Sequence, residues 1–385
     1  MKSATAFTGG KIVTPCGIIE NGFCRVENGV ITAVGEGHFE GGYDLEGRYL
    51  LPGFIDIHCH GGAGYDFMDA TPAEAEEISR YHLLHGTTSL LATTMTDSYP
   101  AITAALENCK KVMAGGRTTI FGVHLEGPWL SPAQCGAQAE KDMKEPDLLK
   151  LSEWLKDFPF IRRVSAAPEL KGGLELGRFC RERGIVASVA HTDADFSLVE
   201  EAAENGYTLV THLYSGMKGV TRKNAFRTAG AVEAGLYSDK LYAEIIGDGV
   251  HLPPELLRFI YKVKGADKLC LITDAMRASG LEEGARSVLG RLEGGLSVIV
   301  EDGVAKTEDR LSFAGSVATM GRVFKTVALA TGAGIEKVSQ MASGTPARAM
   351  GLKDRGEIVP GKRADLIVMN EDFNIEKIFF GGEEV

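Results

Sequence analysis

Two histidines one residue apart follow a short apolar stretch near the start of the chain. Residues 54–58 read Phe-Ile-Asp-Ile-His, after Pro-Gly and shortly before a Gly-Gly pair, which is typical of a buried strand. Side chains two positions apart on a strand point the same way, so His58 and His60 would project together from its C-terminal end. Two converging imidazoles can bind a divalent metal. Taken alone, the pair is equally consistent with two unrelated polar residues at a strand end.

Further acids and histidines follow later apolar stretches in the same way. The stretches that predict strands are 54–58, 88–92, 119–124, 160–166, 186–190, 207–211, 241–246 and 268–273. The metal-type residues at or just after their ends, besides the first pair, are Glu126, His191, His212, Asp248, His251 and Asp274. Helical patterns separate most of the stretches, so the repeats favour a (β/α)8 TIM-like barrel over a doubly wound sheet. In such a barrel all strand ends meet at the rim where active sites are built.

Composition narrows the possible partners and the compartment. The 385 residues are 44% hydrophobic and carry a formal net charge of −11, which argues against nucleic acid or an anionic membrane as partner. An anionic substrate would need a local basic cluster. The 7 cysteines include no Cys-x-x-Cys pair, which indicates reduced thiols and a cytoplasmic protein. No long apolar run follows the N-terminal Met, so we expect neither a signal peptide nor a membrane span.

Both ends of the chain are rich in short apolar runs broken by glycine and asparagine, a pattern typical of strands and hairpin turns. The simplest interpretation is a small β-sandwich domain built from residues 1–52 and 355–385. Residues 53–354 would then form the barrel, inserted between the two halves. Within this stretch, residues 286–313 indicate an added hairpin region.

Several motifs together resemble the amidohydrolase superfamily. Residues 52–61, Pro-Gly-Phe-Ile-Asp-Ile-His-Cys-His-Gly, resemble its entry motif, and residues 359–366 resemble its C-terminal return to the β-domain. Within the superfamily, residues 124–128 (His-Leu-Glu-Gly-Pro), 211–214 (Thr-His-Leu-Tyr) and 248–251 (Asp-Gly-Val-His) are similar to motifs of the N-acetylglucosamine-6-phosphate deacetylase family. The resemblance covers nearly the whole chain.

This resemblance implies a metal-dependent hydrolase that releases acetate from an N-acetylated amino-sugar 6-phosphate. It assigns a divalent metal, zinc or iron, to Glu126, His191 and His212, and the role of general base and acid to Asp274. Some members bind a second ion through a His-x-His pair. Since His58 and His60 are both present here, one or two ions per subunit are expected, with the glutamate bridging them.

The resemblance also implies the substrate contacts, and here the chain departs from the family. His251 corresponds to a substrate-binding histidine. Ser215 and Gly216 stand where the family has Asn-Ala, and Gln138 where it has a histidine. Arg227 is the nearest match to an arginine that reaches the phosphate of a neighbouring subunit's substrate, which implies a homodimer. The loop that contains this arginine is basic, with Lys218, Arg222, Lys223 and Arg227. It either supplies the positive charge that a phosphate needs or is merely a solvated basic loop.

Other interpretations stay open. The enzyme could act on another N-acyl substrate, such as N-acetylgalactosamine 6-phosphate or an N-acyl amino acid. The chain could also be a scaffold that kept the barrel and lost the chemistry, although the intact acid and histidine set argues against this. Some residues of reactive type are interpreted as structural or surface residues. These are His38, Cys59, His82, His85 and His124.

Overall fold

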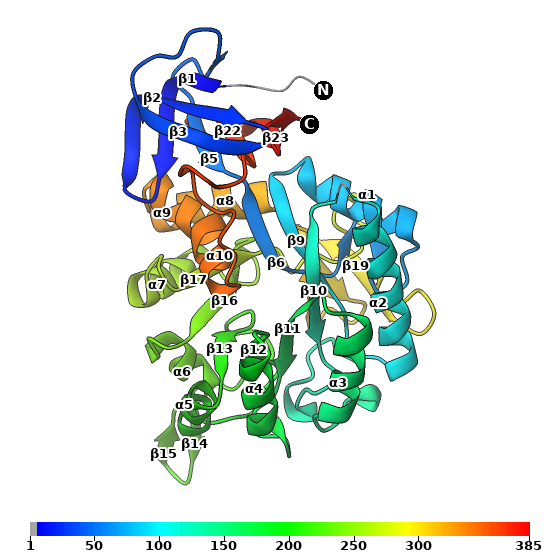
Figure 1. Cartoon of the computed structure of the whole chain (residues 1–385). Coiled ribbons are helices and arrows are strands. Elements are labelled where there is room, and N and C mark those ends of the chain that lie inside the picture. The colour runs from blue at the N-terminus through cyan, green and yellow to red at the C-terminus, as the bar shows by residue number, and fades with distance from the viewer. Residues whose placement is uncertain (1–5, 117) are drawn as a thin grey trace.

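Eight parallel strands form a nearly closed barrel at the centre of the computed structural model, which describes residues 6–116 and 118–385 (Figure 1). In order around the barrel the strands are β6 (Phe54–Cys59), β9 (Thr87–Thr93), β10 (Ile120–Glu126), β11 (Ile161–Ala166), β12 (Val186–Val189), β13 (Tyr207–Val210), β16 (Tyr242–Ile246) and β17 (Leu269–Ile272). Each strand falls on one of the apolar stretches, so the predicted barrel is confirmed.

The barrel closes between its first and last strands, β6 and β17. Just beyond β17, the hydroxyl of Thr273 donates to the Asp56 carboxylate at 2.6 Å, and the backbone N–H of Asp274 donates to the carbonyl of His58 at 3.0 Å. A parallel bridge between Cys59 and Ala275 extends the contact. The closure therefore brings the end of the first strand beside the end of the eighth.

Helices surround the barrel, packing apolar faces on the strands. They are α1 (Pro72–Leu83), α2 (Tyr99–Ala114), α3 (Leu148–Asp157), α4 (Gly173–Glu182), α5 (Phe196–Glu204), α6 (Ala231–Tyr237), α7 (Pro254–Lys264) and α8 (Met320–Thr331). Helix α1 begins where the Thr-Pro pair predicts, because Thr71 accepts from the backbone of Glu74 while Glu74 reaches back to Thr71. This reciprocal cap satisfies backbone donors that a helix start leaves free.

Strands from both ends of the chain share one sheet above the barrel (Figure 1). They are β1 (Ala6–Thr14), β2 (Gly17–Glu27), β3 (Val30–Glu36), β4 (Tyr43–Asp44), β5 (Tyr49–Pro52), β22 (Leu366–Met369), β23 (Ile375–Phe380) and β24 (Glu383–Glu384). The sheet folds back on itself, with the Ile31 N–H donating to Lys362 at 2.8 Å, and encloses its own core, which includes Phe7, Leu366 and Phe379. The β-rich unit from both termini is confirmed, and the domain limits at 52 and 355 stay a prediction.

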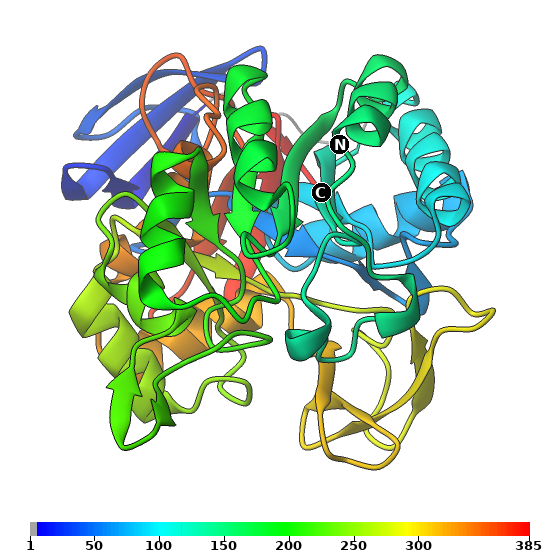
Figure 2. The ribbon, with the colours of Figure 1, turned by 90° about the horizontal axis from the view of Figure 1, so that it is seen from below.

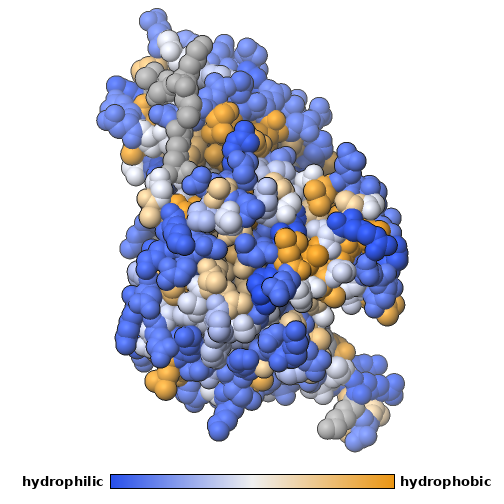
Figure 3. All heavy atoms as spheres, turned by 90° about the vertical axis from the view of Figure 1, so that its right-hand side faces the viewer, coloured by the Kyte–Doolittle hydropathy of each residue, from blue (hydrophilic) through white to orange (hydrophobic). Residues whose placement is uncertain are grey.

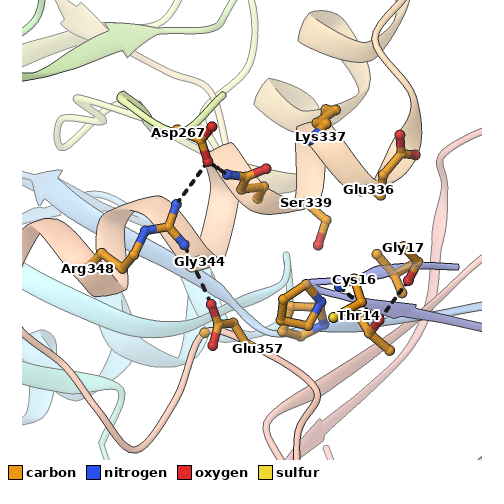
Figure 4. A pocket seen from close by; sticks show the side chains of 15 residues that line it. Thr14, Cys16, Gly17, Asp267, Glu336, Lys337, Ser339, Gly344, Arg348 and Glu357 are labelled. Carbon is orange, nitrogen blue, oxygen red and sulfur yellow. Dashed lines mark hydrogen bonds and ion pairs between the residues drawn. The ribbon is translucent and has the colours of Figure 1, made fainter. Parts of the chain in front are cut away.

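A cavity of about 440 Å³ lies where this sheet meets the barrel (Figure 4). One wall is the β1–β2 turn, and the other contains α9 (Ile335–Ser339), a π-helical turn over 340–344 and α10 (Thr345–Ala349). Arg348 reaches between the carboxylates of Asp267 and Glu357, 3.8 and 3.5 Å away. Arg348 thus offsets part of the negative charge at this seam.

Directly after β6, the short strands β7 (Gly61–Gly62) and β8 (Tyr65–Asp66) pair with each other, and two larger β elements project from the barrel. The predicted hairpin region is a four-stranded antiparallel insert of β18 (Arg286–Leu289), β19 (Leu296–Glu301), β20 (Val304–Thr307) and β21 (Phe313–Ser316). A small hairpin, β14 (Thr221–Lys223) and β15 (Phe226–Thr228), was not predicted. Figure 2 shows the insert in yellow and the hairpin in green at the same edge of the molecule.

The face of the molecule in Figure 3 is mostly hydrophilic, and its apolar residues form small separate groups. Among the described residues, no helix has the length and apolar character needed to cross a bilayer.

An ion pair crosses the interior of the barrel. Arg163 of β11 and Glu244 of β16 are both fully buried and form a two-pronged ion pair. The remaining donors of the guanidinium reach Ser188 at 2.9 Å, Thr211 at 2.8 Å and the carbonyl of Ile57 at 3.1 Å. Burial alone would raise the pKa of Glu244, but Arg163 and His58 hold it below its usual value. This one pair therefore connects four strands and the residue that follows β13.

We expect Glu244→Gln to lower the free energy of unfolding by about 3–5 kcal/mol, because Arg163 would be left buried without its counter-charge. Denaturant unfolding followed by circular dichroism measures the change. Glu301→Gln is the matched control, since Glu301 pairs with Arg310 at the surface and surface ion pairs contribute little. A loss for Glu244→Gln no larger than that of the control would contradict the expectation.

Candidate metal centre and active site

The five residues predicted as metal ligands meet at the C-terminal rim of the barrel. His58 and His60 come from the end of β6, Glu126 from the end of β10, His191 from the residue pair after β12, and His212 from the residue pair after β13. All are buried. They form two groups that could each hold a metal ion, and in each the ligand atoms lie within 4.8 Å of one another. Glu126 belongs to both groups.

The carboxylate of Glu126 lies between the two pairs of histidines. Its Oε1 is 3.0 Å from Nε2 of His212 and 3.5 Å from Nε2 of His191. Its Oε2 is 3.2 Å from Nε2 of His60, and Nε2 of His58 is 3.5 Å from Oε1. The glutamate is therefore placed as a carboxylate that two adjacent metal positions would share.

In two of the histidines, the ring nitrogen Nδ1, which faces away from Glu126, lies beside a hydrogen-bond acceptor that fixes the orientation of the ring. Nδ1 of His191 donates to the carbonyl of Gln134 at 2.8 Å, and Nδ1 of His58 lies 3.3 Å from a carboxylate oxygen of Glu244. With a metal bound, an imidazole that donates from Nδ1 would be neutral and would offer the lone pair of Nε2, the atom that faces Glu126. Such outer contacts are typical of metal-binding histidines.

The charges of the site favour a cation. Burial alone would lower the pKa of His58, but the carboxylates of Glu126 and Asp274 raise it to about 9. Burial alone would likewise raise the pKa of Glu126, and the surrounding histidines hold it well below its usual value. The same negative field would attract a divalent ion, and nitrogen and oxygen ligands of this kind suit zinc or iron. The residues present thus fit the predicted metal.

Asp274 lies against this group. Its Oδ1 is 3.3 Å from Nε2 of both His58 and His60. Burial would raise its pKa, but the positive charge of His58 and the bond to His60 bring the pKa to about 2. Asp274 is therefore ionised near neutral pH and can accept a proton.

Three of these residues occupy strained backbone conformations directly after their strands. The φ angles are 41° for His191, 22° for His212 and 48° for Asp274. Non-glycine residues rarely adopt positive φ, and such strain tends to gather at functional sites. Each turn redirects its side chain toward the rim.

A cavity of about 320 Å³ opens over the group, and four of the five residues predicted to contact substrate line it. These are Gln138, Ser215, Gly216 and His251. Gly216 has a φ of +56°, and a Cβ there would lie 2.5 Å from Nδ1 of His191, so this position requires glycine. Residues that line the cavity without having been predicted include Met95, Tyr214, Leu289, Ser312 and Phe313.

A hydrogen bond to Asp248 holds His251 at the cavity. Asp248 has a lowered pKa because, although it is buried, His251 and backbone N–H groups favour its charged form. Nδ1 of His251 therefore donates to it, at 2.7 Å. The ring packs on Phe313, with 4.8 Å between centroids. The other nitrogen of His251 is left for a molecule in the cavity.

Arg227 is not part of this cavity. It lies exposed on the β14–β15 hairpin, next to Phe226, which is 79% exposed. Among the described residues that line the cavity there is no lysine or arginine. Lys218 pairs with Asp193 at 3.5 Å, and the side chain of Lys223 lies outside what the structure describes.

Residues interpreted as structural have contacts within the protein. His124 bonds Ser165 at 2.7 Å, and burial lowers its pKa well below the usual value. His82 lies 2.9 Å from the carbonyl of Gly61 and 3.3 Å from the sulfur of Cys59, so it supports the end of β6 from behind.

The supporting pair Arg163 and Glu244 was missed in the sequence. Glu244 is the one charged residue of β16, and Arg163 follows Arg162 in the otherwise largely apolar β11. A charged residue within such a strand could have indicated a buried partner. Glu244 also accepts from the backbone N–H of His212 at 3.2 Å. The pair therefore lies directly beneath the candidate metal centre.

The chain is similar to known deacetylases over nearly its full length. The chain is 34% identical over 376 residues to the N-acetylglucosamine-6-phosphate deacetylase of Bacillus subtilis (strain 168), covering 94% of this chain and 92% of that protein. It is 29% identical to an N-acetylgalactosamine-6-phosphate deacetylase of Escherichia coli O157:H7, covering 97% of both.

The fold is also that of a solved structure, N-acetyl-D-glucosamine-6-phosphate deacetylase from Mycobacterium smegmatis. The TM-score is 0.91 at 32% identity, over 99% of this chain and 100% of that one. The model of the amidohydrolase family matches residues 49–385, which include the barrel and every candidate ligand. This chain therefore belongs to the amidohydrolase family.

Proposed function

We propose that this amidohydrolase removes the N-acetyl group of N-acetylglucosamine 6-phosphate, giving glucosamine 6-phosphate and acetate in amino-sugar catabolism. The observation that carries the proposal is the buried group of Glu126, His191 and His212 beside an ionised Asp274, at the base of a cavity of about 320 Å³. Relatives over nearly the full length with this activity in their names support the substrate class. Seven free cysteines support a place in the cytoplasm.

Glu126, His191 and His212 would hold zinc or iron, and His58 and His60 would hold a second ion with the same glutamate. Such an ion supplies Lewis-acid chemistry, because it makes water a better nucleophile near neutral pH and polarises an amide carbonyl. An acetamide needs this help, since it is a poor electrophile.

The residues of the chain carry the proton transfers. Asp274 accepts a proton from the attacking water and delivers it to the amine nitrogen as the amide bond breaks, acting as general base and then general acid. Its position 3.3 Å from both His58 and His60 keeps it at the edge of the ligand group. His251, fixed by Asp248, orients the substrate and steadies the charge that develops on the carbonyl oxygen.

The phosphate requires positive charge that the cavity of one subunit does not supply among the described residues. We therefore propose a homodimer in which Arg227 of the partner subunit reaches the phosphate. The exposed hairpin supports this, because Phe226 and Val220 are large apolar residues that a partner would cover.

The 4-epimer, N-acetylgalactosamine 6-phosphate, is the second candidate substrate. Ser215, Gly216 and Gln138, at which the chain departs from the motifs of the deacetylase family, all line the cavity. A relative named for this substrate matches 97% of the chain. These three positions are where a preference between epimers would be decided.

We expect the purified protein to release acetate from N-acetylglucosamine 6-phosphate, to lose this activity on chelation and to regain it with zinc or iron. An enzyme-coupled acetate assay, with metal content measured on the same sample, checks this. The unphosphorylated sugar and the 4-epimer are assayed side by side. A higher kcat/KM for the 4-epimer would favour the second candidate, and a protein with bound metal but no turnover on either would contradict both.

Asp274→Asn should lower kcat by about 10²- to 10⁴-fold, because the amide cannot carry the proton. The metal content should stay that of the wild type, because the change removes no predicted ligand. Asp302→Asn is the matched control: Asp302 is outside the cavity lining and pairs with Lys306 at the surface, and the kcat of this variant should be unchanged. Substantial turnover by Asp274→Asn would refute the assignment.

Arg227→Ala should lower kcat/KM for the phosphorylated sugar by about 10- to 100-fold, the usual loss for a bond to a charged group of about 1.5–3 kcal/mol. The unphosphorylated sugar should be little affected. Arg222→Ala removes an equal charge from the facing strand of the same hairpin and serves as control. Equal losses in both variants, or a monomer by light scattering, would contradict the proposed role of the partner subunit.

A further inference from the structure

The carboxylate of Glu126 has a neighbour that is not a metal ligand. Gln138, only 7% exposed, lies in the segment between β10 and α3. Its Nε2 donates to Oε2 of Glu126 at 2.8 Å, and its Oε1 accepts from the backbone N–H of Thr96 at 2.9 Å. Thr96 follows β9, so the amide connects the ends of two neighbouring strands.

The bond to Thr96 decides which way the amide faces. A backbone N–H can only donate, so the oxygen of the Gln138 amide must face Thr96. The NH₂ group must then face Glu126, whose Oε2 accepts from it. The fold therefore fixes which group of Gln138 donates to the glutamate. Hydrogen bonds to a charged acceptor are stronger than those between neutral groups.

The bond also selects one carboxylate oxygen. Oε2, which accepts from Gln138, is the oxygen 3.2 Å from Nε2 of His60. Oε1 faces His58, His191 and His212. The terminal torsion of a glutamate is broad, so without an outer bond the carboxylate plane could rotate and both oxygens would lose these partners.

We propose that Gln138 is a positioning residue that holds Glu126 so that Oε2 faces His60 while Oε1 faces His58, His191 and His212. The amide thereby keeps the metal centre ready to bind ions at both positions. This rests on the metal centre of the proposed function, although not on its substrate. The competing role for Gln138 is a contact with the substrate alone, since it also lines the cavity.

The test titrates metal-free protein with zinc by calorimetry. Gln138→Met fills a similar volume without a donor, and Gln138→Ala leaves space. Both should weaken zinc binding by about 10- to 100-fold, the usual loss when an outer partner of a metal ligand is removed. Ser312→Ala, which changes a cavity residue of the insert, should leave zinc affinity unchanged. Circular dichroism of the metal-free variants confirms that they are folded.

Wild-type zinc affinity in both Gln138 variants, with a rise in KM alone, would overturn the proposal in favour of a substrate contact. A loss of zinc affinity in Gln138→Ala but not in Gln138→Met would point to the space left behind rather than to the missing donor. That result would also overturn the proposal. Zinc binding needs no substrate, so a wild-type protein that binds zinc and deacetylates nothing would refute the proposed function while leaving this inference intact. A wild-type protein that binds no zinc would overturn both.

Discussion

The buried pair of Arg163 and Glu244 is the interaction on which the site depends. A charge pair inside a protein is tolerated only when nearly every donor and acceptor is used, and here the surrounding strands supply them. The glutamate also accepts from His58 and from the backbone of His212. The interior of the barrel thus fixes one histidine from each of the two candidate metal positions relative to the other.

This rigid hydrogen-bonded interior beneath the rim explains how strained residues can persist there. His191, His212 and Asp274 all have positive φ, a conformation that the surrounding structure must impose. The walls of the cavity come from different segments, the β18–β21 insert and the loops after β10 and β13. The ends of the strands therefore carry the chemistry, while the loops shape the space for the substrate, as is usual in barrels of this kind.

The sequence predicted the strands and the placement of acids and histidines at the rim because both depend on local patterns, whereas their roles as metal ligands came from the family resemblance and stay a prediction. An apolar run followed by a histidine or an acid places that side chain at the rim regardless of what the rest of the chain does. The partner of Gln138 could not be predicted, because Thr96 meets it only after two strands have become neighbours. Arg227 was predicted from a motif as a phosphate contact, and no local pattern shows that its hairpin projects away from the cavity of its own subunit.

The sheet built from both ends of the chain has a consequence for how the protein is made. Strand β5 pairs with β1 on one side and with β22 on the other, and β22 begins at Leu366, near the end of the chain. During synthesis from the N-terminus, one edge of β5 must wait unpaired while the whole barrel emerges from the ribosome. Open strand edges invite pairing with other chains, so the interval before the last strands arrive is when a nascent chain is most exposed to misassembly.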